Sequence, residues 1–136
     1  MKVLLVGISA ELATVVTKVL GARGHDKVTA RDGVGALEVV ARDAPQLVVV
    51  EDLLPDMSAA DFCHRARAHP GGAEAVILVI TNHADALPSV LDAGATDLYT
   101  TSLGPEALEV RLLIAERLVE QHARLRTREF RIPSPL

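Results

Sequence analysis

Two acidic side chains, Glu51 and Asp52, stand where the sequence is best suited to chemistry. They follow the apolar run at residues 47–50, which lacks polar alternation and is typical of a strand covered on both faces in a parallel sheet. Ligands of open α/β sheets bind at the carboxyl ends of such strands, so a carboxylate here can accept a transferred group or act as a fixed charge. The competing interpretation is a carboxylate that is simply solvated. Asp52 is a rival candidate, but side-chain alternation turns its side chain away from that of Glu51 if the strand continues.

Strand and helix patterns alternate five times along the chain. Strands are predicted at residues 3–6, 27–30, 47–50, 76–80 and 97–100, and helices at 11–20, 34–42, 58–68, 85–93 and from 105 to at least 125. Strands separated by single helices need right-handed crossovers, which put helices on both faces of a parallel sheet. The predicted fold class is α/β: a (βα)5 doubly wound, flavodoxin-like fold whose five-stranded parallel sheet has strand order 2-1-3-4-5.

The bulk composition fits one domain with a sizeable core. The chain has 136 residues, of which 49% are hydrophobic, and we divide it into a domain at residues 1–120 and a C-terminal helix extension and tail at 121–136. No apolar run approaches the roughly 20 residues of a membrane span, and the first residues do not resemble a secretory signal. We therefore expect a cytoplasmic protein. A net charge of −4 argues against nucleic acid as a partner.

The remaining reactive residue types lack a supporting pattern. The single cysteine, Cys63, excludes an internal disulfide and a cysteine-based metal cage, and we expect it to pack in or near the core. The histidines are scattered without ligand spacing, so they are interpreted as surface or partly buried residues. They are His25, His64, His69, His83 and His122.

Three local motifs resemble segments of response-regulator receiver domains, the CheY-like family. Residues 45–57 resemble the phosphoacceptor loop, which in that family is a strand, an aspartate, three residues and a proline. Glu51 stands at the position of the aspartate, and Pro55 at that of the proline. Residues 32–33 with 36–37 resemble the second-helix segment, and residues 94–97 the turn before the fifth strand. The resemblance covers about residues 1–120.

The resemblance also implies a metal site, which this sequence does not retain. Receivers bind Mg²⁺ through two acids after the first strand, because a hard cation prefers carboxylate oxygens. The matching positions are Gly7 and Ile8, and Ile8 is expected to place an apolar side chain in the metal pocket. Glu11 lies nearby, but it is expected in the first turn of a helix, where it interacts with the helix dipole. We therefore expect no cofactor and no Mg²⁺ binding.

Other positions of the family's site are altered as well. The lysine and proline after the fifth strand are replaced by Thr101 and Ser102, and Leu98 stands at the aromatic switch position. Thr81 keeps the hydroxyl that receivers place after the fourth strand. A hydrogen bond from Thr81 to Glu51 would favour a retained switch. Together these changes indicate a degenerate, pseudo-receiver type.

The expected function is a non-enzymatic signal-transduction module that acts by phosphorylation-independent protein–protein interaction. Glu51 is either a partial mimic of aspartyl phosphate or a product of drift. The alternatives are a residual phosphoacceptor receiver of a two-component phosphorelay, using Asp52 or Glu51, and a small-ligand module at the strand-end crevice. The expected partners are a histidine kinase or other signalling protein and a second copy bound through the fourth helix, fifth strand and fifth helix, with no nucleic acid and no membrane.

Overall fold

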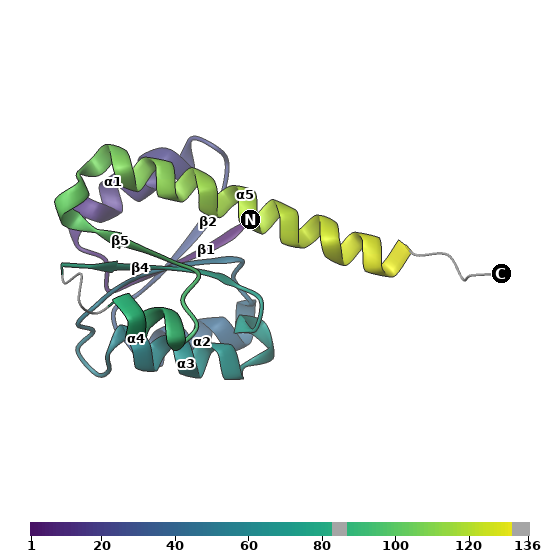
Figure 1. The fold of residues 1–136 in the computed structure, drawn as a ribbon, viewed down its shortest axis with the longest axis horizontal. Coiled ribbons are helices and arrows are strands. Elements are labelled where there is room, and N and C mark those ends of the chain that lie inside the picture. The colour runs from purple at the N-terminus through teal and green to yellow at the C-terminus, as the bar shows by residue number, and fades with distance from the viewer. Residues whose placement is uncertain (83–86, 132–136) are drawn as a thin grey trace.

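The computed structural model describes residues 1–82 and 87–131, and its elements alternate between strand and helix (Figure 1). In chain order they are β1 (Lys2–Val6), α1 (Ala10–Gly21), β2 (Asp26–Ala30), α2 (Gly33–Asp43), β3 (Leu47–Glu51), α3 (Ala59–Ala68), the 3-10 turn η1 (Pro70–Gly72), β4 (Val76–Thr81), α4 (Leu87–Asp92), β5 (Asp97–Thr100), the 3-10 turn η3 (Thr101–Leu103) and α5 (Pro105–Arg131).

The five strands form one parallel sheet in the order β2-β1-β3-β4-β5. The predicted α/β fold class and strand order are thus confirmed. Val6 pairs with Val50, and Val50 with Val79, so β1, β3 and β4 finish at the same edge of the sheet. The residues that follow these strands meet there.

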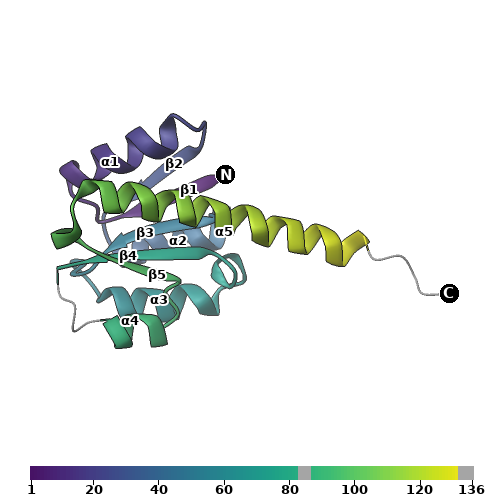
Figure 2. The same cartoon turned by 45° about the horizontal axis from the view of Figure 1, so that its top comes forward.

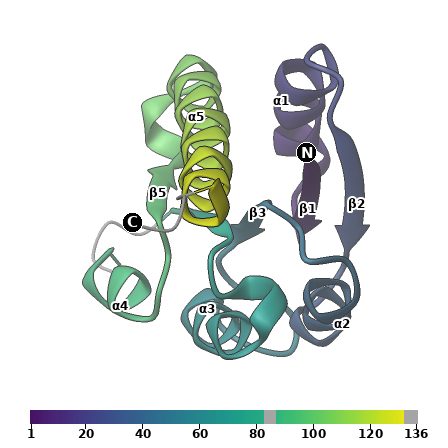
Figure 3. The ribbon, with the colours of Figure 1, turned by 90° about the vertical axis from the view of Figure 1, so that its right-hand side faces the viewer.

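Helices cover both faces of the sheet (Figure 3). Helices α2, α3 and α4 lie on one face and α1 and α5 on the other. Alternate residues of β3 separate accordingly: Val48 and Val50 join the core cluster of the first face, and Leu47 and Val49 that of the second. Cys63 is fully buried in the first cluster, as expected, and burial raises the pKa of its thiol to about 11.

Side-chain caps fix where three helices begin. The Ser9 hydroxyl caps α1 by accepting from Leu12 N–H, Asp32 caps α2, and Ser58 caps α3 at the predicted position. Helix α5 is much longer than the others, with 27 residues, and its C-terminal part extends beyond the sheet (Figure 2). The expected continuation of this helix to at least residue 125 is confirmed.

Some predictions fall outside the described residues. The start of the fourth helix at residue 85, His83, and the tail at 132–136 are among them. Within the part that the structure describes, no helix combines the length and apolarity needed to cross a membrane.

Candidate functional site

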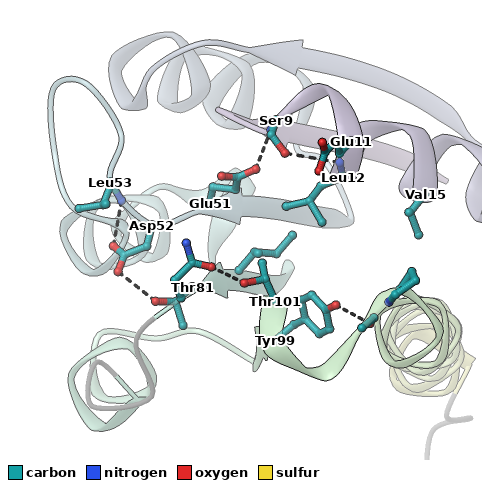
Figure 4. Close-up of a pocket in the computed structure, with 14 residues that line it drawn as sticks. Ser9, Glu11, Leu12, Val15, Glu51, Asp52, Leu53, Thr81, Tyr99 and Thr101 are labelled. Atoms are coloured by element: carbon teal, nitrogen blue, oxygen red, sulfur yellow. Dashed lines mark hydrogen bonds between the residues drawn. The ribbon is translucent and has the colours of Figure 1, made fainter.

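The candidate site lies at the carboxyl edge of the sheet, around the last residue of β3 (Figure 4). A cavity of about 660 Å³ opens there. Its lining includes Glu51 and Asp52 after β3, Thr81 at the end of β4 and Thr101 after β5. The structure brings these predicted positions together, because parallel strands place their carboxyl ends at one edge of the sheet.

Glu51 contacts the loop between β1 and α1. Its Oε1 accepts a hydrogen bond of 2.6 Å from the backbone N–H of Ser9, the residue that also caps α1. The side chain is half-buried and reaches the first residues of the helix, where the helix dipole favours a negative charge. Ser9 had not been assigned a role from the sequence. Only its position before a helical pattern signals one, as a capping residue.

Asp52 faces the opposite side of the site. Its Oδ2 accepts from the Thr81 hydroxyl at 3.4 Å, and its Oδ1 accepts from Leu53 N–H at 3.0 Å. The predicted divergence of Glu51 and Asp52 is confirmed (Figure 4). The buried Thr81 hydroxyl thus donates to Asp52 and not to Glu51.

The positions that match the family's metal-binding acids do not fit Mg²⁺. Gly7 has φ +61°, and a Cβ added to it would lie 2.6 Å from Cδ2 of the buried Leu54. The expectation for Ile8 was wrong in detail: its half-buried side chain packs against the core on the α1 and α5 face and does not line the cavity. Among the side chains that the structure describes, no three from histidine, cysteine, aspartate or glutamate are grouped to hold a metal ion.

The end of β5 is held by hydroxyl groups. Thr101 Oγ1 donates to the side-chain oxygen of Asn82, and the Thr100 and Ser102 hydroxyls lie 3.2 Å apart. Leu98 is 7% exposed and packs in the core under α2, α3 and α4. Because leucine has no polar group, nothing in this side chain favours a move toward solvent.

Tyr99, next to Leu98, points to the other face of the sheet. Its ring is 2% exposed, and its hydroxyl donates to the Gly104 carbonyl oxygen at 2.5 Å. Burial raises the pKa of this phenol. The ring lines the cavity, and the bond to Gly104 fixes its hydroxyl end.

Asp56, in the loop after β3, does not line the cavity but fixes the loop that follows Glu51 and Asp52. Asp56 accepts from Gly33 N–H at 2.8 Å and from Val34 N–H at 3.0 Å, and these bonds lower the pKa of Asp56. It thereby joins the loop after β3 to the first turn of α2. Both segments were recognised in the sequence, but nothing there indicated that they are joined.

The fold and site define a class of protein: a doubly wound flavodoxin-like domain with an acidic site at the carboxyl ends of its strands. No family model matches the sequence. The chain is 36% identical over 100 residues to the transcriptional regulatory protein KdpE of Mycobacterium tuberculosis, an alignment that covers 72% of this chain and 43% of KdpE. It is 33% identical over 113 residues to the DNA-binding response regulator MtrA of the same organism, covering 82% of this chain and 48% of MtrA.

A solved structure agrees with these relatives. The beryllofluoride-activated N-terminal receiver domain of RstA from Klebsiella pneumoniae is similar with a TM-score of 0.70 and 27% identity, covering 85% of this chain and 97% of that domain. The chain belongs to the receiver-domain family of two-component response regulators. It spans about half the length of the curated relatives that it matches.

The partner prediction was wrong. It excluded nucleic acid and named a kinase, another signalling protein or a second copy, whereas the relatives are a transcriptional regulatory protein and a DNA-binding response regulator. The error came from the net charge of −4, which describes this domain and carries no information about the other half of such relatives.

Proposed function

We propose that this receiver domain is a pseudo-receiver, which signals without phosphotransfer, without Mg²⁺ and without catalytic activity of its own. Its contacts with other proteins then do not depend on phosphorylation, and we keep the cytoplasm as its expected location. The observation that carries the proposal is the 2.6 Å hydrogen bond from Ser9 N–H to Glu51. Through this bond Glu51 contacts directly the loop on which receivers carry their metal-binding acids.

The extra methylene of glutamate explains how this contact acts. It extends the carboxylate from the end of β3 to the first residues of α1, so strand and helix are linked without an intervening cation. A phosphoryl group would bring roughly −1.5 to −2 charges and three acceptor oxygens, and glutamate supplies one charge and two oxygens. Glu51 is thus a fixed, partial substitute for the charge that phosphorylation would add.

The altered lysine position supports the same proposal. Thr101, which replaces the lysine, donates to Asn82 and offers no positive charge to a phosphoryl group. Transfer of a phosphoryl group relies on cations that neutralise its developing charge. A site lined by carboxylates without such a cation disfavours the transfer.

The proposal is tested by titrating the protein with Mg²⁺ to millimolar concentration and then adding beryllofluoride or acetyl phosphate. We expect the amide NMR signals of Glu51, Thr81 and Ser9 to stay in place. Saturable, metal-dependent shifts centred on Glu51 and Thr81 would contradict the proposal.

One observation favours a second candidate, the residual phosphoacceptor receiver. The 3.4 Å contact between Asp52 and the Thr81 hydroxyl pairs a possible acceptor with a hydroxyl donor. If this candidate holds, acetyl phosphate adds the mass of one phosphoryl group to the protein, and Asp52→Asn removes the addition while Glu51→Gln retains it. The pseudo-receiver proposal predicts no added mass in any of the three proteins.

A further inference from the structure

The cavity at the carboxyl edge has the size and mixed lining of a small-molecule site. Its volume of about 660 Å³ lies within the roughly 300–1,000 Å³ typical of ligand pockets. The end of the cavity nearest the strands is polar, with Glu51, Asp52, Thr81 and Thr101.

The charged lining residues that the structure describes are all acids. They are Glu11, Glu51 and Asp52, and no lysine, arginine or histidine is found among the described lining residues. Carboxylates concentrated in a concave site favour cations and repel anions, phosphoryl groups included. The recorded hydrogen bonds of Glu51 and Asp52 leave lone pairs on their oxygens, because an ionised carboxyl group has about four acceptor sites.

Another part of the cavity wall is apolar. Leu12 and Val15 line it from α1 (Figure 4), and Ile80 and Tyr99 line it from β4 and β5. Tyr99 is held by its bond to Gly104, so this wall is formed before any ligand arrives. A hydrated metal ion would gain nothing from these side chains, whereas a hydrocarbon body would be removed from water against them.

We propose that this cavity binds a small organic monocation, a primary amine with an apolar body. Its ammonium group contacts Glu51, its hydrocarbon part packs between α1 and Tyr99, and Asp52 adds a second negative charge to the lining. The inference rests on the proposed function in one respect: the site must be free of a metal ion and a phosphoryl group. The ligand would then bias the position of α1 relative to the sheet in place of phosphorylation.

The test uses 2-phenylethylamine, with 2-phenylethanol as the neutral isostere and phenylacetate as the anion. NMR titration is expected to show saturable shifts at Leu12, Val15, Glu51 and Tyr99 with the amine, and affinities at least about tenfold weaker for the alcohol and the anion. Equal affinity for amine and alcohol would overturn the proposal, and so would the absence of saturable shifts with the amine at millimolar concentration.

Matched variants separate a site from general attraction to an acidic protein. Glu51→Gln should weaken amine binding about tenfold, because it removes one charge-assisted contact. Glu38→Gln changes the net charge equally at an exposed position of α2 and should leave the affinity unchanged. Equal losses in both variants would overturn the site. The Mg²⁺ and acetyl phosphate experiments test the pseudo-receiver proposal, and the amine titration tests the ligand site. The failure of one proposal can therefore be distinguished from the failure of the other.

Discussion

Two glutamates of this domain have opposite surroundings. Glu116 of α5 is 6% exposed and binds two basic side chains, Arg23 at 2.6 Å and His25 at 2.5 Å. Glu51 is half-buried at the carboxyl edge, where it accepts from a neutral backbone N–H in a cavity whose described lining contains acids but no basic side chain. The structural carboxylate of Glu116 is thus paired with basic side chains, whereas the site carboxylate of Glu51 is not paired with any basic side chain that the structure describes.

The ion pairs of Glu116 have a direct effect on its ionisation. Hydrogen bonds from Arg23 and His25 lower the pKa of Glu116, and burial opposes them only partly. His25 also lies 3.1 Å from the terminal amino group of Met1 through Nδ1. These contacts join the end of α1, the start of β2 and the middle of α5, so Glu116 belongs to the packing of the domain.

The largest expected effect comes from placing an acid at Gly7, the position that matches a metal-binding acid of the family. Gly7→Asp should lower the free energy of unfolding by about 3 kcal/mol, because it forces a Cβ into the space of Leu54 and a side chain onto a positive φ. Urea unfolding measures the loss.

Leu54→Ala provides the control for the Gly7 variant. The losses from Gly7→Asp and Leu54→Ala should be less than additive in the double variant, because the shortened side chain removes the clash. Full additivity would show that Leu54 does not close this position.

A smaller loss is expected when the paired glutamate loses its charge. Glu116→Gln should lower the free energy of unfolding by about 2 kcal/mol, since it leaves Arg23 and His25 without their carboxylate. Glu109→Gln on the same helix is the matched control: its contact with Lys18 is 4.0 Å long and exposed, and its loss should stay within about 0.5 kcal/mol. Equal losses of unfolding free energy in Glu116→Gln and Glu109→Gln would show that the close ion pairs of Glu116 contribute no more than the exposed contact of Glu109.

The stability lost in Glu116→Gln is expected to depend on pH. A carboxyl group whose pKa is lowered by folding stabilises the protein fully above its ordinary pKa of 4.5, and this stabilisation is lost as the pH falls below it through the lowered value. The difference in stability between the wild type and Glu116→Gln should therefore be constant near neutral pH and shrink below about 4.5. A difference that stays constant down to pH 3 would assign the effect to shape and not to charge.

The smallest effect on stability is expected at the site itself. Glu51→Gln keeps an oxygen for the Ser9 N–H and removes a charge that has no basic neighbour among the described lining residues, so the free energy of unfolding should change by less than about 0.5 kcal/mol. Hydrogen exchange of the first turn of α1 should nevertheless change, because the bond to Ser9 is weaker without charge. A loss comparable to that of Glu116→Gln would make Glu51 a second structural carboxylate.

The fold could be predicted because its signals are local. The uninterrupted apolar runs of β3 and β4 and the helical patterns between the strands are visible within short windows, and crossover handedness then restricts the topology. The divergence of Glu51 and Asp52 followed from strand alternation alone.

Other features depend on contacts between distant segments. Leu54 fills the space beside Gly7, and Arg67 donates to the carbonyl oxygens of Gly72 and Ala75, before β4, and of Gly94, before β5. The pairing of Glu116 with Arg23 and His25 joins residues more than ninety positions apart. Such contacts follow from how the helices settle on the sheet, which no local pattern encodes.

The length of α5 has a mechanical consequence. Its 27 residues span about 40 Å, and Glu116 holds it to the body near its midpoint. Leu108 and Leu112 pack the N-terminal half against the sheet, close to the turn that Tyr99 holds. Because a helix is stiff over this distance, a tilt of about 10° at that anchor displaces its far end, about 22 Å away, by about 4 Å. The domain therefore has the geometry of a lever whose short arm lies beside the cavity.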